Sequence, residues 1–304
     1  MRNTCLNMIY ELAKKDKRIF FIGSDLAVGT LRKFKDEMPD RFFMEGISEA
    51  NIIGMAAGLA LNGKIVYVNT IASFITRRCF EQIVLDLCLH NVNVRLIGNG
   101  GGLAYGQLGP THEATDDITI LRTIPNMTIL VPADAEEMIR LMPETVNHKG
   151  PIYIRMARGG DPIVSKNESF KIGKAIQIRE GTDALVITTG ITLKIAIAAA
   201  EDLASKNVSV GILHVPTIKP LDKESILEMV SKVPTIVTIE EHSIIGGLGS
   251  SIAELIAESN FLIPKRFKIL GIPDIFITTY GSQEDLLEKY SITKEHLILT
   301  ILGV

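Results

Sequence analysis

Tryptophan is absent from this chain of 304 residues, and cysteine occurs only three times. Cys5, Cys79 and Cys88 do not have the spacing of metal ligands, so we expect no metal site built by this chain. Cys79 and Cys88 lie in an apolar segment, where free thiols are usually buried. Such thiols fit a reducing compartment, and we expect the protein in the cytoplasm.

An excess of basic charge is also missing. Lys and Arg number 32 against 35 Asp and Glu, a net charge of -3, and no basic stripe is present, so nucleic acid is not an expected partner. No apolar run is long and uncharged enough to span a membrane, so no membrane association is expected. Residues 1–17 mix acidic and basic groups in an amphipathic pattern, which is not the pattern of a signal peptide.

The chain does have the length of two domains and, with 46% hydrophobic residues, the content of large cores. Strand-like runs alternate with helical segments through both halves. This alternation predicts an α/β fold of two three-layer α/β/α domains with mostly parallel sheets. We place the first domain at 1–160, a polar linker at 161–180 and the second domain at 181–304.

Residues 44–60, MEGISEANIIGMAAGLA, combine a predicted helix that is apolar nearly all round with two carboxylates, Glu45 and Glu49. A carboxylate is rarely buried unless it is paired or used. For Glu45, a functional role and a stabilising role as an acid near the helix start are equal alternatives. Glu49, placed inside the helix, is the better candidate for a functional acid.

Three further candidates follow predicted strands. Asp25 lies at a carboxyl edge, where open α/β sheets bind ligands, although a turn or capping role is an equal alternative. His112, in a long glycine-rich loop, is either a general acid/base or a solvated loop histidine. Arg158 either faces an anionic substrate or forms a salt bridge.

Two stretches carry a resemblance to a known family. EGISEANIIGMAAGLA at 45–60 and GQLGPTHEATDDITILRTIPNMTILVPADAEEM at 106–138 resemble the pyrimidine-binding domain of transketolase and its thiamine-diphosphate relatives. TDALVITTG at 182–190 and EEHSIIGGLGSS at 240–251 resemble the transketolase C-terminal domain. The resemblance covers the whole chain, and the first two motifs together are highly specific.

The family's diphosphate-binding signature is missing. That signature, Gly-Asp-Gly followed by Asn-Asn, does not occur in this sequence. The resemblance therefore implies the C-terminal subunit of a split transketolase, in which a separate N-terminal subunit holds thiamine diphosphate through Mg²⁺ or Ca²⁺. It also implies that this chain alone is inactive, and that two copies pair through their first domains in an α2β2 assembly.

The resemblance also assigns roles for moving a two-carbon ketol unit from a ketose to an aldose. Glu49 matches the carboxyl group that hydrogen-bonds the aminopyrimidine ring nitrogen, and burial favours the protonated acid that such a bond requires. Phe74 matches the aromatic residue on the pyrimidine, with an ordinary core role as the alternative. Asp25 and Ile53 are also assigned to the cofactor. His112 matches the active-site histidine of the GPTH motif, as proton shuttle or oxyanion partner.

The family holds the substrate phosphate with two arginines, which the resemblance places at Arg2 and Arg158, with Arg155 as the alternative to Arg158. Leu108 stands where the family has an aspartate that reads the acceptor, a histidine is missing from 98–102, and a serine is missing near Gly29. Losing a hydrogen bond to a hydroxyl should alter specificity. A modified ketose is therefore weighed against the ordinary pentose-phosphate sugars.

Two other functions stay open. One is another enzyme of the family, a deoxyxylulose-phosphate synthase or the β-subunit of a 2-oxoacid dehydrogenase, although the GPTH form and the length favour transketolase. The other is a non-catalytic paralogue that acts as a binding or regulatory module, against which Glu49 and His112 argue. His214 and His242, at strand ends of the second half, are expected to be structural.

Overall fold

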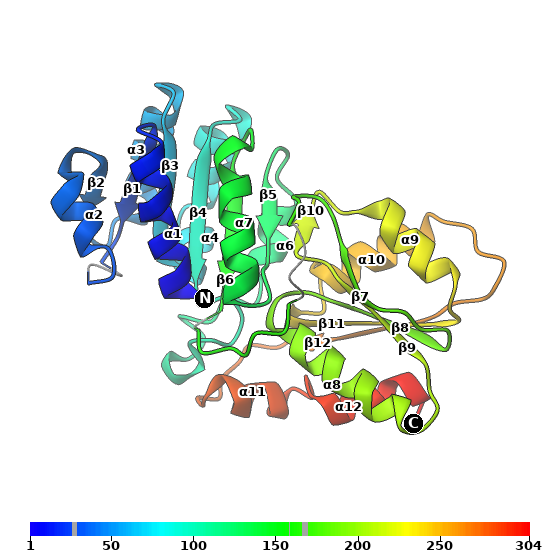
Figure 1. Cartoon of the computed structure of the whole chain (residues 1–304). Coiled ribbons are helices and arrows are strands. Elements are labelled where there is room, and N and C mark those ends of the chain that lie inside the picture. The colour runs from blue at the N-terminus through cyan, green and yellow to red at the C-terminus, as the bar shows by residue number, and fades with distance from the viewer. Residues whose placement is uncertain (26–28, 158, 166–169) are drawn as a thin grey trace.

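The computed structural model describes residues 1–25, 29–157, 159–165 and 170–304. It contains two sheets, of seven and five strands, and helices cover both faces of each (Figure 1). Only the edge strands β10 and β7 run antiparallel to their neighbours. The structure therefore confirms the predicted α/β class with mostly parallel sheets.

The first sheet has the strand order β10-β5-β6-β4-β3-β1-β2. Its strands are β1 (Ile19–Gly23), β2 (Phe42–Met44), β3 (Ile65–Ile71), β4 (Val94–Asn99), β5 (Thr128–Leu130), β6 (Ile152–Met156) and β10 (Thr217–Lys219). Because side chains alternate along a strand, Phe21 and Tyr67 enter the core on one face, while Ile22 and Val68 enter the core on the other.

The first of these faces is covered by two helices that pack on each other, α1 (Arg2–Lys15) and α7 (Ala135–Asn147). Asp134 caps α7 by accepting a hydrogen bond from the backbone of Glu137. The second face is covered by α3 (Glu49–Leu61), α4 (Ala72–Arg77), α5 (Phe80–Gln82), the π-helical η2 (Ile83–Leu89) and α6 (Asp117–Arg122). The short helices α2 (Arg32–Glu37) and η1 (Pro39–Arg41) precede β2, and η3 (Gly106–Leu108) lies in the glycine-rich loop.

The second sheet has the order β12-β11-β8-β9-β7. Its strands are β7 (Ile176–Arg179), β8 (Ala184–Thr188), β9 (Val210–His214), β11 (Thr235–Ser243) and β12 (Arg266–Ile272). One face packs against α8 (Leu193–Ala204), α11 (Gln283–Lys289) and α12 (Lys294–Leu302), and the other against α9 (Lys223–Ser231) and α10 (Leu248–Ala257). The turn η4 (Gly190–Thr192) joins β8 to α8.

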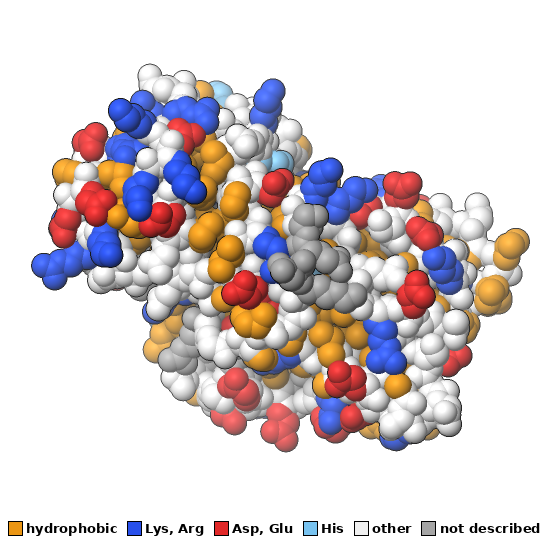
Figure 2. Space-filling model, viewed as in Figure 1, with side chains coloured by type: hydrophobic (Ala, Val, Ile, Leu, Met, Phe, Trp, Pro, Cys, Tyr) orange, Lys and Arg blue, Asp and Glu red, His pale blue; other side chains and the backbone are white. Residues whose placement is uncertain are grey.

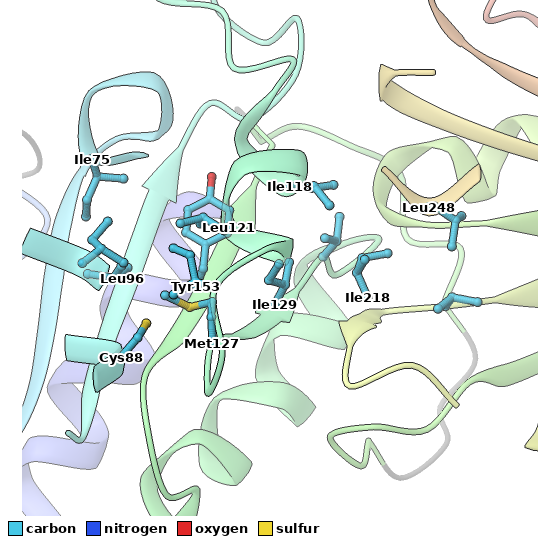
Figure 3. Close-up of a cluster of buried hydrophobic side chains, with 14 of the residues drawn as sticks. Ile75, Cys88, Leu96, Ile118, Leu121, Met127, Ile129, Tyr153, Ile218 and Leu248 are labelled. Carbon is cyan, nitrogen blue, oxygen red and sulfur yellow. The ribbon is translucent and has the colours of Figure 1, made fainter. Parts of the chain in front are cut away.

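The two sheets share one hydrophobic core. In Figure 3, Leu121 and Ile118 of α6 lie between the first-sheet residue Leu96 and the second-half residues Ile218 and Leu248. The strand β10 strengthens this junction, because it comes from the second half of the chain but pairs with β5 of the first sheet. Burial across the junction therefore fixes how the two halves face each other.

Two local predictions differ from the structure. The segment 161–180, expected to be a linker, ends in the strand β7, which pairs with β9 and so belongs to the second sheet. The helix expected to be apolar and buried nearly all round starts at Glu49 and buries one face, while Ala50, Asn51 and Gly54 are exposed. The helix looks apolar in the sequence because its exposed face carries small residues, and not because all of its faces are buried.

The surface carries charges of both signs. On the face shown in Figure 2, basic and acidic side chains are interspersed. In the described part of the chain, no helix combines the length and apolar character needed to cross a bilayer.

Candidate active site

The carboxyl ends of β1 and β3 meet where the strand order of the first sheet reverses, which is where ligands bind in open α/β sheets. Ser24 follows β1, and its hydroxyl donates to Thr70 Oγ1 on β3 at 2.9 Å. Thr70 Oγ1 in turn donates to Glu49 Oε1 at 3.5 Å. Ser24 Oγ also lies 3.1 Å from Oδ1 of the exposed Asp25. The hydroxyls of Ser24 and Thr70 therefore lie between the predicted residues Asp25 and Glu49, and Ser24 can donate its one proton to either Thr70 or Asp25.

Glu49 is the first residue of α3 and is 4% exposed, whereas Glu45 is exposed and precedes the helix. The surroundings of Glu49 are not purely apolar, because Arg78 Nη1 lies 3.2 Å from its Oε2. A helix N-terminus and an adjacent guanidinium both favour a negative charge. The sheltered position agrees with the prediction, but in the chain by itself this carboxylate is paired.

Phe74 in α4 contacts two of the residues around Glu49. The guanidinium carbon of Arg78 lies 3.8 Å from the centroid of the Phe74 ring. The His112 ring also contacts Phe74: the two ring centroids are 5.0 Å apart and the ring planes are inclined by 60°. The structure thus brings Glu49, Phe74 and His112 into one cluster, and Arg78 is the link. Arg78 follows Phe74 by four positions, a helical spacing that places two side chains on one face and that the sequence already offered as a signal.

Hydrogen bonds fix both the backbone and the ring of His112. Ser73 Oγ donates to the His112 carbonyl at 3.2 Å, and Thr111 Oγ1 lies 2.9 Å from Nδ1. The His112 side chain is half-buried. This arrangement orients the imidazole through Nδ1, and Nε2 has no hydrogen-bond partner among the described residues.

The other predicted residues lie in different settings. Ile53 is fully buried in the core, one turn along α3 from Glu49. Arg2 begins α1 and is half-buried. Its backbone nitrogen would lie 3.9 Å from a Cβ placed on Gly159, so the start of the chain lies against the segment after β6. Arg158 lies outside the described residues.

Arg155 has a structural position. Its side chain is 7% exposed, and its Nε lies 2.8 Å from Asp117 Oδ2. Its Nη2 donates at 2.9 Å to the carbonyl oxygens of Ala114 and, in the second half, of Glu241. The Tyr153 hydroxyl donates to the same Asp117 oxygen at 2.6 Å. A guanidinium engaged in this way is not open to a substrate anion, so Arg155 is not a good alternative to Arg158.

Buried acids and histidines connect the two halves around this network. His214 Nε2 lies 2.9 Å from Glu137 Oε2, and both side chains are fully buried. His242 lies 3.8 Å from Asp117 Oδ1, again with both side chains fully buried. Both histidines thus face acids of the first half, as expected for a structural role.

Burial raises the pKa of Glu241 to about 7, although the charge of Arg155 opposes this shift.

The glycine-rich loop is shaped by close packing. Gly100 has φ +71°, and a Cβ there would lie 2.1 Å from the Tyr105 ring, so the loop has no space for a side chain at this position. Tyr105 lies edge-on to His112, with centroids 6.5 Å apart. Leu108, in the same loop, is 51% exposed, so it presents an apolar side chain to solvent. Next to His112, burial raises the pKa of Glu113 to about 7.

The corresponding edge of the second sheet is covered. Gly190, after β8, donates from its backbone to the Val131 carbonyl at 3.2 Å. Thr192 Oγ1 donates to the Ile239 carbonyl at 3.0 Å, and the Glu240 carboxylate accepts bonds from the start of α10. The bond to Val131 comes from the first half, which therefore lies against the end of β8. Across the described ranges, no group of three His, Cys, Asp or Glu side chains is arranged to hold a metal ion.

Two family sequence models match the chain. The transketolase pyrimidine-binding domain matches residues 1–160, and the transketolase C-terminal domain matches residues 173–297. A solved structure described as a split gene transketolase in an inactive β4 tetramer superimposes with a TM-score of 0.88. It is 33% identical in sequence and covers 99% of this chain and 96% of its own.

Several curated proteins are similar over nearly the full chain. The 6-deoxy-6-sulfo-D-fructose transketolase subunit of Clostridium sp. (strain MSTE9) is 36% identical over 98% of this chain and 92% of its own length. One of the subunits of the apulose-4-phosphate transketolase of Phocaeicola vulgatus is 36% identical over 99% and 96%. The 1-deoxy-D-xylulose-5-phosphate synthase of Desulfotalea psychrophila is 37% identical over 97% of this chain, but that match spans 46% of the synthase.

Proposed function

Because this chain belongs to the transketolase family, we propose that it is the C-terminal subunit of a two-chain, thiamine-diphosphate-dependent transketolase. In this proposal residues 1–160 supply the pyrimidine half of the cofactor site and residues 181–304 support assembly. The observation that carries the proposal is the cluster of the sheltered Glu49, the Phe74 ring and His112 at the switch point of the first sheet.

The residues present fit one half of the cofactor. The guanidinium of Arg78 lies on the Phe74 ring while bonded to Glu49, which indicates that a planar, hydrogen-bonding group has room there. The described residues offer no corresponding group of metal ligands, so we assign Mg²⁺ or Ca²⁺ and the diphosphate to a separate N-terminal subunit. When bound, thiamine diphosphate supplies a carbanion that cleaves and forms carbon–carbon bonds.

The chain's own residues bind, orient and protonate. Glu49 would hold the ring nitrogen of the pyrimidine through a shared proton, and Phe74 would pack on that ring. His112 Nε2 exchanges protons with the sugar oxygen at the reacting carbon. Asp25 and Ile53 are assigned to the cofactor side of the site, and Arg2 and Arg158 to the anionic end of the sugar.

We propose an anionic ketose as donor and an aldose as acceptor. Two relatives are named for 6-deoxy-6-sulfo-D-fructose and for apulose 4-phosphate, so the named sugars differ among proteins similar to this chain. Leu108 supports a change of this kind, because its exposed apolar side chain offers no hydrogen bond to a hydroxyl.

The test is reconstitution. The chain is mixed with its N-terminal partner, thiamine diphosphate, Mg²⁺ and an aldose acceptor. Ketose phosphates, a sulfonated ketose, pyruvate and longer 2-oxoacids are then supplied one at a time as donors. We expect two-carbon transfer from a ketose, with a loss of about 100-fold or more in Glu49→Gln, since that variant keeps the shape but not the proton. Turnover of pyruvate alone would favour the synthase-like alternative, which the similarity to deoxyxylulose-phosphate synthases supports.

We also propose that two copies of this chain pair through their first domains within an α2β2 assembly, and that the isolated chain is inactive. The solved split transketolase described as an inactive β4 tetramer supports self-association of such subunits. Native mass spectrometry of the mixed subunits should show two copies of each. A monomeric chain in the presence of its partner would contradict the pairing.

A further inference from the structure

Arg78 makes two contacts that a bound aminopyrimidine would also need. Its Nη1 donates to Glu49 Oε2 at 3.2 Å, and its guanidinium carbon lies 3.8 Å from the centroid of the Phe74 ring. A guanidinium is flat, carries several N–H donors at its edge and stacks on aromatic faces. Arg78 therefore offers a donor to the carboxylate and a flat face to the ring, as the cofactor ring is expected to do.

The attachment of Arg78 is weak compared with that of its neighbour. Its side chain is 47% exposed and bonds to one oxygen of Glu49 through one nitrogen. Arg77 instead places Nε and Nη2 on the carboxylate of Asp116, at 3.0 and 2.8 Å. Because the Arg78 side chain is half-exposed and makes one bond to the buried carboxylate, a group that bonds to the same carboxylate can displace it.

We propose that Arg78 is a stand-in for the aminopyrimidine, occupying its place on Phe74 and Glu49 in the free subunit and leaving when the cofactor enters. This inference rests on the proposed function and names a regulatory contact within the same site. In the free subunit Arg78 keeps a positive charge beside the Glu49 carboxylate, which is 4% exposed and would be costly to leave unpaired.

The proposal has a consequence for protons. In the free subunit the Glu49 carboxylate is balanced by Arg78. With the cofactor bound, one proton would be shared by the Glu49 carboxylate and the ring nitrogen, and the Arg78 guanidinium would no longer contact the carboxylate. That proton comes from solvent, so exchanging the guanidinium for the cofactor ring takes up about one proton.

The experiment is calorimetric titration of thiamine diphosphate into the assembled two-chain complex with Mg²⁺ at pH 6.5, in buffers that differ in ionisation enthalpy. The buffer dependence gives the number of protons taken up. Arg78→Ala and Arg78→Met are compared with the wild type, and Arg77→Ala serves as the matched control. Circular dichroism confirms that each variant is folded.

For both Arg78 variants we expect binding that is about three- to tenfold tighter, because no side chain has to be displaced; this equals about 0.7–1.4 kcal/mol. We also expect clearly lower proton uptake, because these variants have no guanidinium whose positive charge the proton replaces. Arg77→Ala should match the wild type in both quantities. A purely structural arginine would change affinity without changing proton uptake.

Two results would overturn the inference alone: binding that is tenfold weaker, which would make Arg78 a cofactor contact, or unchanged affinity with unchanged proton uptake. Failure of the wild-type complex to bind the cofactor would instead overturn the proposed function, and the stand-in with it.

Discussion

Replacing Arg155 by Met should destabilise the fold rather than weaken substrate binding. The change leaves Asp117, which is fully buried, with the Tyr153 hydroxyl as a hydrogen-bond donor but without its cation, and it removes bonds to two carbonyl oxygens. Breaking a buried ion pair by removing one partner costs about 3–5 kcal/mol. We therefore expect Arg155→Met to lower the free energy of unfolding by about 4 kcal/mol.

The assay is urea denaturation followed by circular dichroism and tyrosine fluorescence, and agreement of the two signals tests whether the two halves unfold together. Arg18→Met is the control, because Arg18 pairs with Asp16 at the surface and should change stability by less than about 1 kcal/mol. Asp117→Asn should also be costly, and the double variant should cost about 2–3 kcal/mol less than the sum of the single variants.

The reasoning would be refuted if Arg155→Met changed stability by less than about 1 kcal/mol while raising the KM for the anionic donor in the assembled enzyme. That result would make Arg155 the anion-binding arginine. Additive single and double variants would equally show that the two side chains do not act as a pair.

Three further outcomes are expected. His112→Ala should lower kcat of the assembled enzyme by about 100-fold or more while cofactor affinity measured by calorimetry is retained, and an unchanged kcat would contradict a role in proton transfer. Because burial raises the pKa of Glu113 from 4.5 to about 7, the folded chain binds a proton that the unfolded chain has released, so this residue makes stability fall between pH 4.5 and 7. Glu113→Gln should flatten that fall in urea titrations across this range, and an unaltered slope would be evidence against it. Gly102 has φ +66°, and a Cβ there would lie 2.4 Å from the Glu241 carboxyl carbon, so Gly102→Val should lower the melting temperature by several degrees in scanning calorimetry, whereas no change would show that the interface adapts.

Much of the fold could be predicted because apolar periodicity reveals which residues share a face. The strands that form the two sheets were found in this way, with the exception of β7 and β10, which are four and three residues long. Both contain few apolar residues, IQIR and TIK, whereas the equally short edge strand β2 reads FFM, so apolar periodicity gives little signal at β7 and β10. Their pairing also depends on a partner far away in the sequence. The one-sided burial of α3 was missed because alanine and glycine on its exposed face look apolar in a sequence.

The site could be predicted only as far as its motifs reach. Glu49, Phe74 and His112 were named from sequence, and the structure brings them together, although their roles stay predictions. Arg78 was not named, since nothing local shows that its guanidinium reaches a carboxylate 29 positions earlier. The sequence left open whether Arg155 or Arg158 binds the substrate anion, and the buried contacts of Arg155 with Asp117 argue against Arg155.

The pairing of β10 with β5 limits how this protein can be divided or recombined. A fragment cut near residue 160 would expose the backbone edge of β5, and unpaired edges promote aggregation. The remaining piece would in turn carry three residues whose partner strand is missing. A chimera that takes its second half from a relative must therefore reproduce the register Thr217↔Leu130 and Lys219↔Ile129. Without this register, β10 would not pair with β5 and the two halves would not pack together.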